Sequence, residues 1–264
     1  MAASPALMAR GRDRRFYFIV AALAAALVFT GFARTFYLNG FFAKLHLASL
    51  FVVHGVVFSS WLVVLVTQSV LISAKQVKLH QRLGYASIGI FAGMVVLGWI
   101  MSVDAAQRGF TPPGGPPPLT FLGFQLLGLF IFTAIIAAGF LYRNRPETHK
   151  RLMIAGTVTL ITPAVARIFL LFTTSMIIFK AFGVQLAILI GCMVYDYVNR
   201  KQVHRAYIWS TLAFVAWIPT SLLIGNTRAW LAVAHWSLNS VDNNPKSDFA
   251  LPQLQPWFRH SSYR

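Results

Sequence analysis

The stretch that decides the fold is LHLASLFVVHGVVFSSWLVVLVTQSVLIS, residues 45–73, which contains no Asp, Glu, Lys or Arg. A helix needs about 20 mostly apolar residues to cross the hydrocarbon core of a bilayer. The backbone inside lipid must be helical, because no water is present to hydrogen-bond free amides. This stretch therefore predicts a transmembrane helix, long enough to be tilted or to extend past the interface.

Six further apolar runs of similar length surround this stretch. Of the 264 residues, 57% are hydrophobic and 11% are charged, against about 25% charged residues in a soluble domain. We predict an all-α polytopic membrane bundle of about seven helices across residues 16–225. A basic cytoplasmic N-terminus (1–15) precedes it, and an extracytoplasmic tail (226–264), partly interfacial or disordered, follows it. The predicted helices cover 16–36, 45–73, 83–103, 119–142, 152–174, 177–198 and 207–224.

Basic residues predict the orientation. Fourteen Lys and Arg residues fall in segments that a cytoplasmic N-terminus places inside, and only four, Arg34, Lys44, Arg108 and Lys180, fall in the outer loops. Such a bias is typical of the positive-inside rule, so we expect a bacterial inner membrane protein. The net charge of +17 then indicates contact with anionic lipid headgroups and not with nucleic acid.

The first apolar run has two interpretations. The basic residues before it and the small residues near Gly31 resemble a signal peptide. Its length exceeds the 7–15 residues usual for the apolar region of such a peptide, however. We expect it to be an uncleaved membrane anchor.

A stripe of polar and aromatic residues follows one face of the second helix. His54, Trp61, Gln68 and Lys75 are spaced by seven, a step that returns to nearly the same helix face. This face either packs inward, with His54 and Gln68 hydrogen-bonded to neighbouring helices, or lines a polar site.

Arg167 is the most costly residue of the predicted spans, since a charge at membrane depth costs about 2.5–3.5 kcal/mol on insertion scales. Counted along the helices, His54, Gln125 and Arg167 all lie about 9–13 Å below the outer surface. Arg167 either snorkels, caps carbonyls near Pro163, or binds an anion. The sequence thus predicts a polar site formed by His54, Trp61, Gln68, Gln125 and Arg167.

Three histidines, each followed closely by an arginine, begin odd-numbered helices. His80, His149 and His204 lie in KLHQRLG (78–84), THKRLM (148–153) and VHRAY (203–207). The three hairpins they join are candidate diverged repeats. The histidines either converge on a metal ion or a haem or serve as helix caps and lipid contacts. Asp196, at the end of the sixth helix, is expected to pair with an inner arginine.

Several segments together resemble an uncharacterised group of bacterial seven-helix membrane proteins. They are H-x7-H-x6-W-x6-Q (46–68), LHQRLG (79–84), RPETHKRLM (145–153) and YDYVNRKQVHRAYIW (195–209). LHQRLG is also similar to segments of the cytochrome b561 and ferric reductase class, in which neighbouring histidines ligate haem b. That likeness implies electron transfer through one bis-histidine haem b near the inner face, because the outer-half histidines, His46 and His54, share one helix.

No metalloprotease or prenyltransferase motif names a reaction in this sequence, so we leave open whether the protein is an enzyme. Three functions remain as hypotheses. The first is electron transfer by a protein that binds a b-type haem or a metal. The second is binding or transport of a small lipophilic or anionic molecule, and the third is an accessory role beside a membrane-protein partner.

Overall fold

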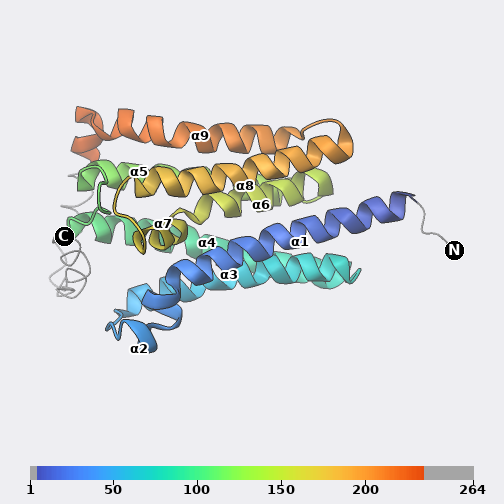
Figure 1. Ribbon diagram of the computed structural model, residues 1–264, viewed down its shortest axis with the longest axis horizontal. Helices are drawn as coiled ribbons and strands as arrows, with labels where there is room; N and C mark the ends of the chain where they lie inside the picture. Colours follow the sequence, from blue (N-terminus) through green and yellow to red (C-terminus); the bar gives the residue numbers. More distant parts are fainter. Residues whose placement is uncertain (1–4, 235–264) are drawn as a thin grey trace.

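The computed structural model describes residues 5–234, with side chains from residue 11 onward, and forms helices without strands over that part of the chain. Figure 1 shows them as a bundle of long, roughly parallel helices. The elements are α1 (Pro5–Phe32), the π-helix η1 (Ala33–Tyr37), α2 (Asn39–Phe42), α3 (Ser49–Ser73), α4 (Val77–Gln107), α5 (Pro118–Leu141), α6 (Pro146–Leu160), α7 (Thr162–Leu170), α8 (Ile177–Arg200) and α9 (Arg205–Gly225).

Seven of these helical segments are long and apolar enough to cross a membrane, with α6 and α7 together forming the fifth. The predicted seven-helix fold is therefore confirmed. The boundaries differ at the polar ends. Helix α4 begins six residues before the expected 83, since polar residues at an interface can continue a helix while their side chains stay solvated. Helix α3 begins at Ser49 and not at 45, because the Asn39 amide hydrogen-bonds both Leu45 N and Leu45 O and holds that link out of the helix.

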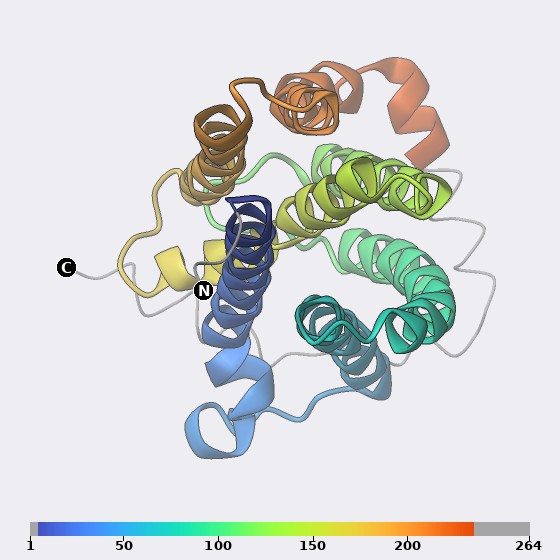
Figure 2. The same ribbon diagram turned by 90° about the vertical axis from the view of Figure 1, so that its right-hand side faces the viewer.

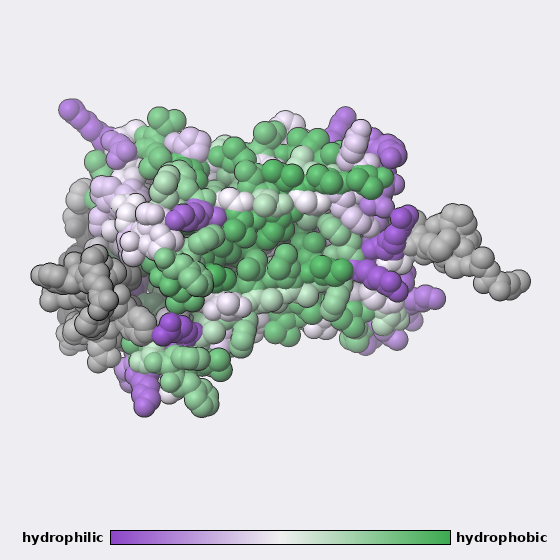
Figure 3. Space-filling model, viewed as in Figure 1, coloured by the Kyte–Doolittle hydropathy of each residue, from purple (hydrophilic) through white to green (hydrophobic). Residues whose placement is uncertain are grey.

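We call the end of the bundle that holds residues 11–15 and the links 74–76, 142–145 and 201–204 the basic end, and the opposite end the far end. Figure 3 shows a broad apolar band between two hydrophilic ends. Large hydrophobic side chains such as Val63, Phe130 and Leu223 are exposed within this band. Lipid contact accounts for such a surface, and the chain is a multi-pass membrane protein.

The fifth span is the centre of the bundle. Helix α6 packs against α1, α5, α8 and α9, while α7 packs against α1 and α8, an arrangement that can be followed along the bundle in Figure 2. In an 18-residue apolar stretch of this span, 61% of the residues are buried, against 17–33% in the corresponding stretches of the other six. Polar groups carried by α6 and α7 are therefore the most enclosed by protein.

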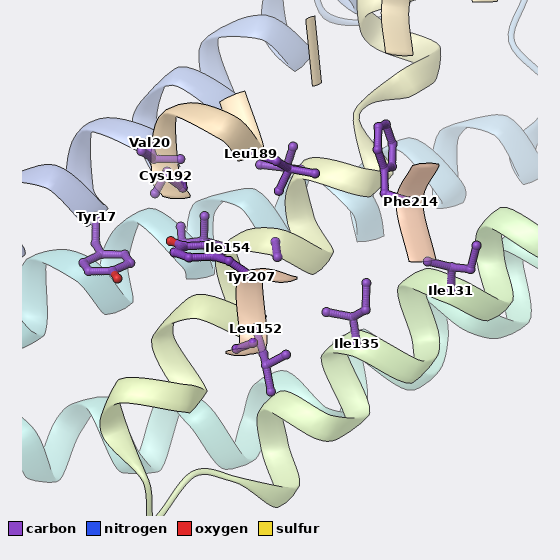
Figure 4. Close-up of a cluster of buried hydrophobic side chains, with 14 of the residues drawn as sticks. Tyr17, Val20, Ile131, Ile135, Leu152, Ile154, Leu189, Cys192, Tyr207 and Phe214 are labelled. Atoms are coloured by element: carbon purple, nitrogen blue, oxygen red, sulfur yellow. The ribbon is translucent and has the colours of Figure 1, made fainter. Parts of the chain in front are cut away.

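The main core lies around α6, where Ile154 and Ala155 meet side chains from α1, α5, α8 and α9. Figure 4 shows Tyr207 and Phe214 of α9 reaching into this cluster beside Leu189 and Cys192 of α8. Without a hydrophobic driving force between helices in lipid, such close packing and hydrogen bonding hold the bundle together.

The central span is broken at Ile161, where α6 ends and α7 begins. Pro163 has no N–H, so the carbonyl of Thr159 loses its helical partner. The Thr162 hydroxyl donates to that carbonyl at 3.4 Å, and the Gln185 amide of α8 donates to Thr162 Oγ1 at 3.0 Å. The break is thus braced by polar groups.

Candidate functional site

The predicted stripe on α3 faces the bundle at three of its four positions. Trp61 is buried and donates its indole N–H to Thr157 Oγ1 at 3.1 Å. Gln68 Nε2 donates to the carbonyl of His80 at 3.1 Å. His54 Nδ1 is buried, and its ring stacks on Phe58 of the same helix with centroids 4.0 Å apart. Lys75 lies beyond the end of α3 and is exposed.

Two of the three histidines at the basic end come together. The rings of His80 on α4 and His149 on α6 have centroids 6.3 Å apart and are nearly perpendicular, at 85°. His149 Nδ1 lies 2.7 Å from the carbonyl oxygen of Gly139. Since a carbonyl only accepts, Nδ1 carries the proton and Nε2 presents its lone pair.

Two polar atoms at this pair, one of them on His80 itself, lack hydrogen-bond partners. His80 Nδ1 and Gln68 Oε1 are both buried without a hydrogen bond in the structure. Unsatisfied buried polar atoms are few in native proteins, and each one calls for an explanation such as a ligand. We call His80, His149 and Gln68 the two-histidine site.

His204 has a different role. Its backbone N–H donates to Asp196 Oδ2 at 3.3 Å, and its ring Nδ1 accepts from the N–H of Ala206 at 3.1 Å, so it caps α9. Within the described part of the chain, no three His, Cys, Asp or Glu side chains lie close enough to hold a metal ion together. Any metal at the two-histidine site would thus be held without His204.

An aromatic cluster lies between the two ends of the α3 stripe. Trp61 contacts Phe91, Phe132 and Phe140 with ring centroids 6.3–6.4 Å apart. Phe91 also meets Phe132 and Phe140 at 5.8 Å and 5.7 Å. These rings separate the two-histidine site from the polar residues nearer the far end.

The polar residues nearer the far end are His54, Gln125 and Arg167. His54 Nδ1 and Gln125 Oε1 are buried without hydrogen bonds. Arg167 is half-buried, stands over the Phe32 ring at 4.4 Å and donates to the carbonyl of Pro163 at 3.1 Å. The last contact matches one predicted alternative, a cap on carbonyls near Pro163.

A network of charges ties α1, α6 and α8 together at the basic end. Arg151 is fully buried and holds buried Asp196 through two bonds, from Nε to Oδ2 at 2.7 Å and from Nη2 to Oδ1 at 2.6 Å. The expectation that Asp196 pairs with an inner arginine is confirmed. We call the whole set, Asp13, Glu147, Lys150, Arg151, Asp196 and Arg200, the ionic lock.

Most of the ionic lock was missed at the level of sequence. Arg151 counted there only as one of many inner basic residues, yet it is enclosed because α6 is the central helix. Its spacing from Glu147, an i,i+4 pair, was the one local signal available. The contact between Asp13 and Lys150 at 2.9 Å joins residues 137 positions apart, which no local pattern indicates.

No protein-family profile matches this chain, and neither a curated protein nor a solved structure is significantly similar to it.

Proposed function

We propose that this multi-pass membrane protein binds one first-row transition-metal ion, as haem b iron or as a bare ion, between His80 and His149, and serves in electron transfer. The observation that carries the proposal is the 6.3 Å separation of the two ring centroids. We further propose that it resides in a bacterial inner membrane with the basic end in the cytoplasm, because basic residues concentrate at that end.

The separation exceeds that of a direct hydrogen bond between the rings. Two imidazoles joined by a hydrogen bond of about 3 Å have centroids only about 5.2 Å apart. At 6.3 Å and 85° the two rings meet edge to face, within the range of about 4.5–7 Å at which aromatic rings pack in this way. The two imidazoles are therefore close neighbours without bonding to each other, and both could contribute a nitrogen to one ion.

The residues around the rings fit a metal in two further ways. Metal-ligating histidines usually donate their other ring N–H to a carbonyl or carboxylate, as His149 does to Gly139. One turn after His80, Gly84 adds no side chain beside the pair, and a Cβ there would meet only the Gln68 amide nitrogen within 4 Å, at 3.6 Å. This glycine keeps the side of α4 next to His80 free of a bulky side chain, as a ligand at the pair requires.

The donor set also indicates what would be bound. Gln68 Nε2 is held by the His80 carbonyl, so its free Oε1 would offer a third, neutral ligand to a bare ion. Neutral imidazoles suit iron, copper and zinc better than calcium or magnesium, which prefer carboxylates and water. Bound haem iron or copper would supply a reversible one-electron couple, while the Gly139 carbonyl would fix the orientation of the His149 ring.

The test is an absorbance spectrum and a metal analysis of the purified full-length protein, before and after incubation with haemin, Cu²⁺ or Zn²⁺. We expect about one equivalent of haem or metal, lost in His80→Ala and in His149→Ala. A Soret band that responds to dithionite would identify haem, and metal without that band would identify a bare ion.

His46→Ala is the matched control, because His46 lies in the link before α3 at the far end and should keep full occupancy. His204→Ala should keep it as well. If the protein takes up neither haem nor metal under any of these conditions, or if the His46 variant loses as much as the His80 variant, the proposal is wrong.

A further inference from the structure

The far half of the bundle carries two departures from regular helix, one on each of two helical segments that touch. The central span breaks at Ile161 before Pro163, and α1 turns into the π-helix η1 at Ala33–Tyr37. A Cβ on Gly31 would lie 2.2 Å from the carbonyl oxygen of Ala164, so α1 and α7 touch backbone to backbone beside both. Irregular backbone at membrane depth persists where protein or a polar cavity covers it, and π-helical turns gather at functional sites.

Arg167 projects from α7 at this place. Of its five N–H donors, the structure assigns one hydrogen bond, to the Pro163 carbonyl. It also stands over the Phe32 ring at 4.4 Å. Among the side chains of residues 11–234, no carboxylate lies within ion-pair distance of Arg167, whereas the lock arginines Arg151 and Arg200 each have at least two.

α1 and η1 connect Arg167 to the His54 region of α3. Arg167 stands over the Phe32 ring, and one turn further along the Phe36 ring occupies the space beside Gly55, the neighbour of His54. The Tyr37 hydroxyl lies 2.7 Å from Ser59 Oγ, so η1 closes this side of α3. His54 Nδ1 is buried without a partner.

The helical register places Gln125 opposite His54. Trp61 of α3 and Phe132 of α5 are in contact, and both helices run from the far end to the basic end (Figure 1). His54 and Gln125 each lie seven residues before that contact, about 10 Å nearer the far end on the same faces. Gln125 Oε1, also buried and unpartnered, thus shares a depth with His54.

We propose that Arg167, His54 and Gln125, bounded by α1, α3, α5 and α7, bind a small amphiphile carrying one carboxylate or phosphate. The acid pairs with the Arg167 guanidinium, whose planar fork matches such groups. Gln125 Oε1 accepts from a hydroxyl or amide of the ligand, and His54 Nδ1 bonds to it as well. The apolar body lies against Trp61 and Phe132, which close the site towards the basic end.

This inference is independent of the proposed metal site. The two sites lie on opposite sides of the aromatic cluster and share no residue. Their chemistry also differs, since the two-histidine site presents neutral imidazoles whereas the Arg167 site presents a positively charged guanidinium.

The test uses the purified full-length protein in a neutral detergent and the quenching of tryptophan fluorescence by 11-bromoundecanoate. Its uncharged counterpart, 11-bromoundecanol, is the matched probe. We expect saturable quenching by the acid, removed in large part in Trp61→Phe, and at least tenfold weaker binding of the acid to Arg167→Gln. The alcohol should bind wild type and Arg167→Gln equally. Lys180→Gln, a basic residue at the far end, and His80→Ala should both bind the acid like wild type.

Equal quenching by the acid and the alcohol in wild type would overturn the proposal. This comparison needs no variant, so it tests the proposal even if Arg167→Gln fails to fold. Arg167→Lys, which keeps the charge and loses the planar guanidinium, should bind 11-bromoundecanoate with intermediate affinity.

Two competitors distinguish the source of the ligand. Displacement of the probe by phosphatidylglycerol indicates a membrane lipid, and displacement by hexanoate indicates a free acid. If 11-bromoundecanoate shows no saturable binding and neither competitor displaces it, the proposal is contradicted.

Discussion

Arg151 and Arg167 lie on consecutive pieces of the same central span, and their surroundings are opposite. Arg151 is enclosed by two carboxylates, Asp196 and Glu147, within a lock whose three acids and three bases balance. Arg167 has a ring and a carbonyl. The fold supplies the counter-ions of Arg151, so this buried charge holds helices together. The described part of the fold supplies no counter-ion for Arg167, so this charge fits a ligand that brings its own.

The largest loss of stability should come from removing the carboxylate partner of Arg151. Asp196→Ala leaves Arg151 buried without its closest partner and should lower the free energy of unfolding by about 3–5 kcal/mol. SDS titration in mixed micelles measures it. Glu147→Gln, at a half-exposed position, should cost about 1 kcal/mol or less, and similar losses for the two variants would show that burial of the pair is unimportant.

A second variant probes the backbone contact that positions Arg167. In Gly31→Ala the new Cβ meets the Ala164 carbonyl, which is backbone and cannot rotate away. We expect a loss of about 1–3 kcal/mol, as for other overpacked sites, together with weaker binding of 11-bromoundecanoate. Gly183→Ala is the control, because a Cβ there has no neighbour within 4 Å; equal stability of the two variants would refute the close approach.

Removing the charge of Arg167 should raise the free energy of unfolding, whereas removing the charge of Arg151 should lower it. Without ligand, Arg167→Gln should raise the free energy of unfolding by about 1–2 kcal/mol, the cost of the charge less the lost contact with Phe32. Stability at binding sites is often given up for function. A loss as large as that of Arg151→Gln, measured by the same SDS titration, would mean that Arg167 is a structural residue.

The smallest change in stability should come from His204, which caps α9 and donates its backbone N–H to Asp196 of the ionic lock. Partial burial lowers the pKa of His204, with the nearby Arg151 acting in the same direction and Asp196 against it. The neutral ring accepts from Ala206 N, so its contribution is complete above about pH 6.5 and is lost as the pH falls through the lowered pKa.

We therefore expect the wild type to lose about 1 kcal/mol of stability between pH 7.5 and pH 5, the value of a typical helix cap. His204→Asn keeps a capping side chain that does not titrate and should lose less over this range. Thermal denaturation at the two pH values compares them, and parallel curves for both proteins would exclude His204 as the titrating group.

The sequence by itself determined the seven spans and the inward face of α3, because lipid demands long apolar helices and a step of seven keeps one face. It also indicated that Asp196 pairs with an arginine, since an acid at the membrane boundary beside several arginines has ready partners. Only the tertiary structure decided that the arginine is Arg151, that His149 meets His80 while His204 caps a helix, and that α1 and α7 meet at Gly31. These features depend on which helix occupies the centre of the bundle. That choice rests on packing of α6 against helices that lie from tens to more than a hundred positions away in the chain, which no local pattern records.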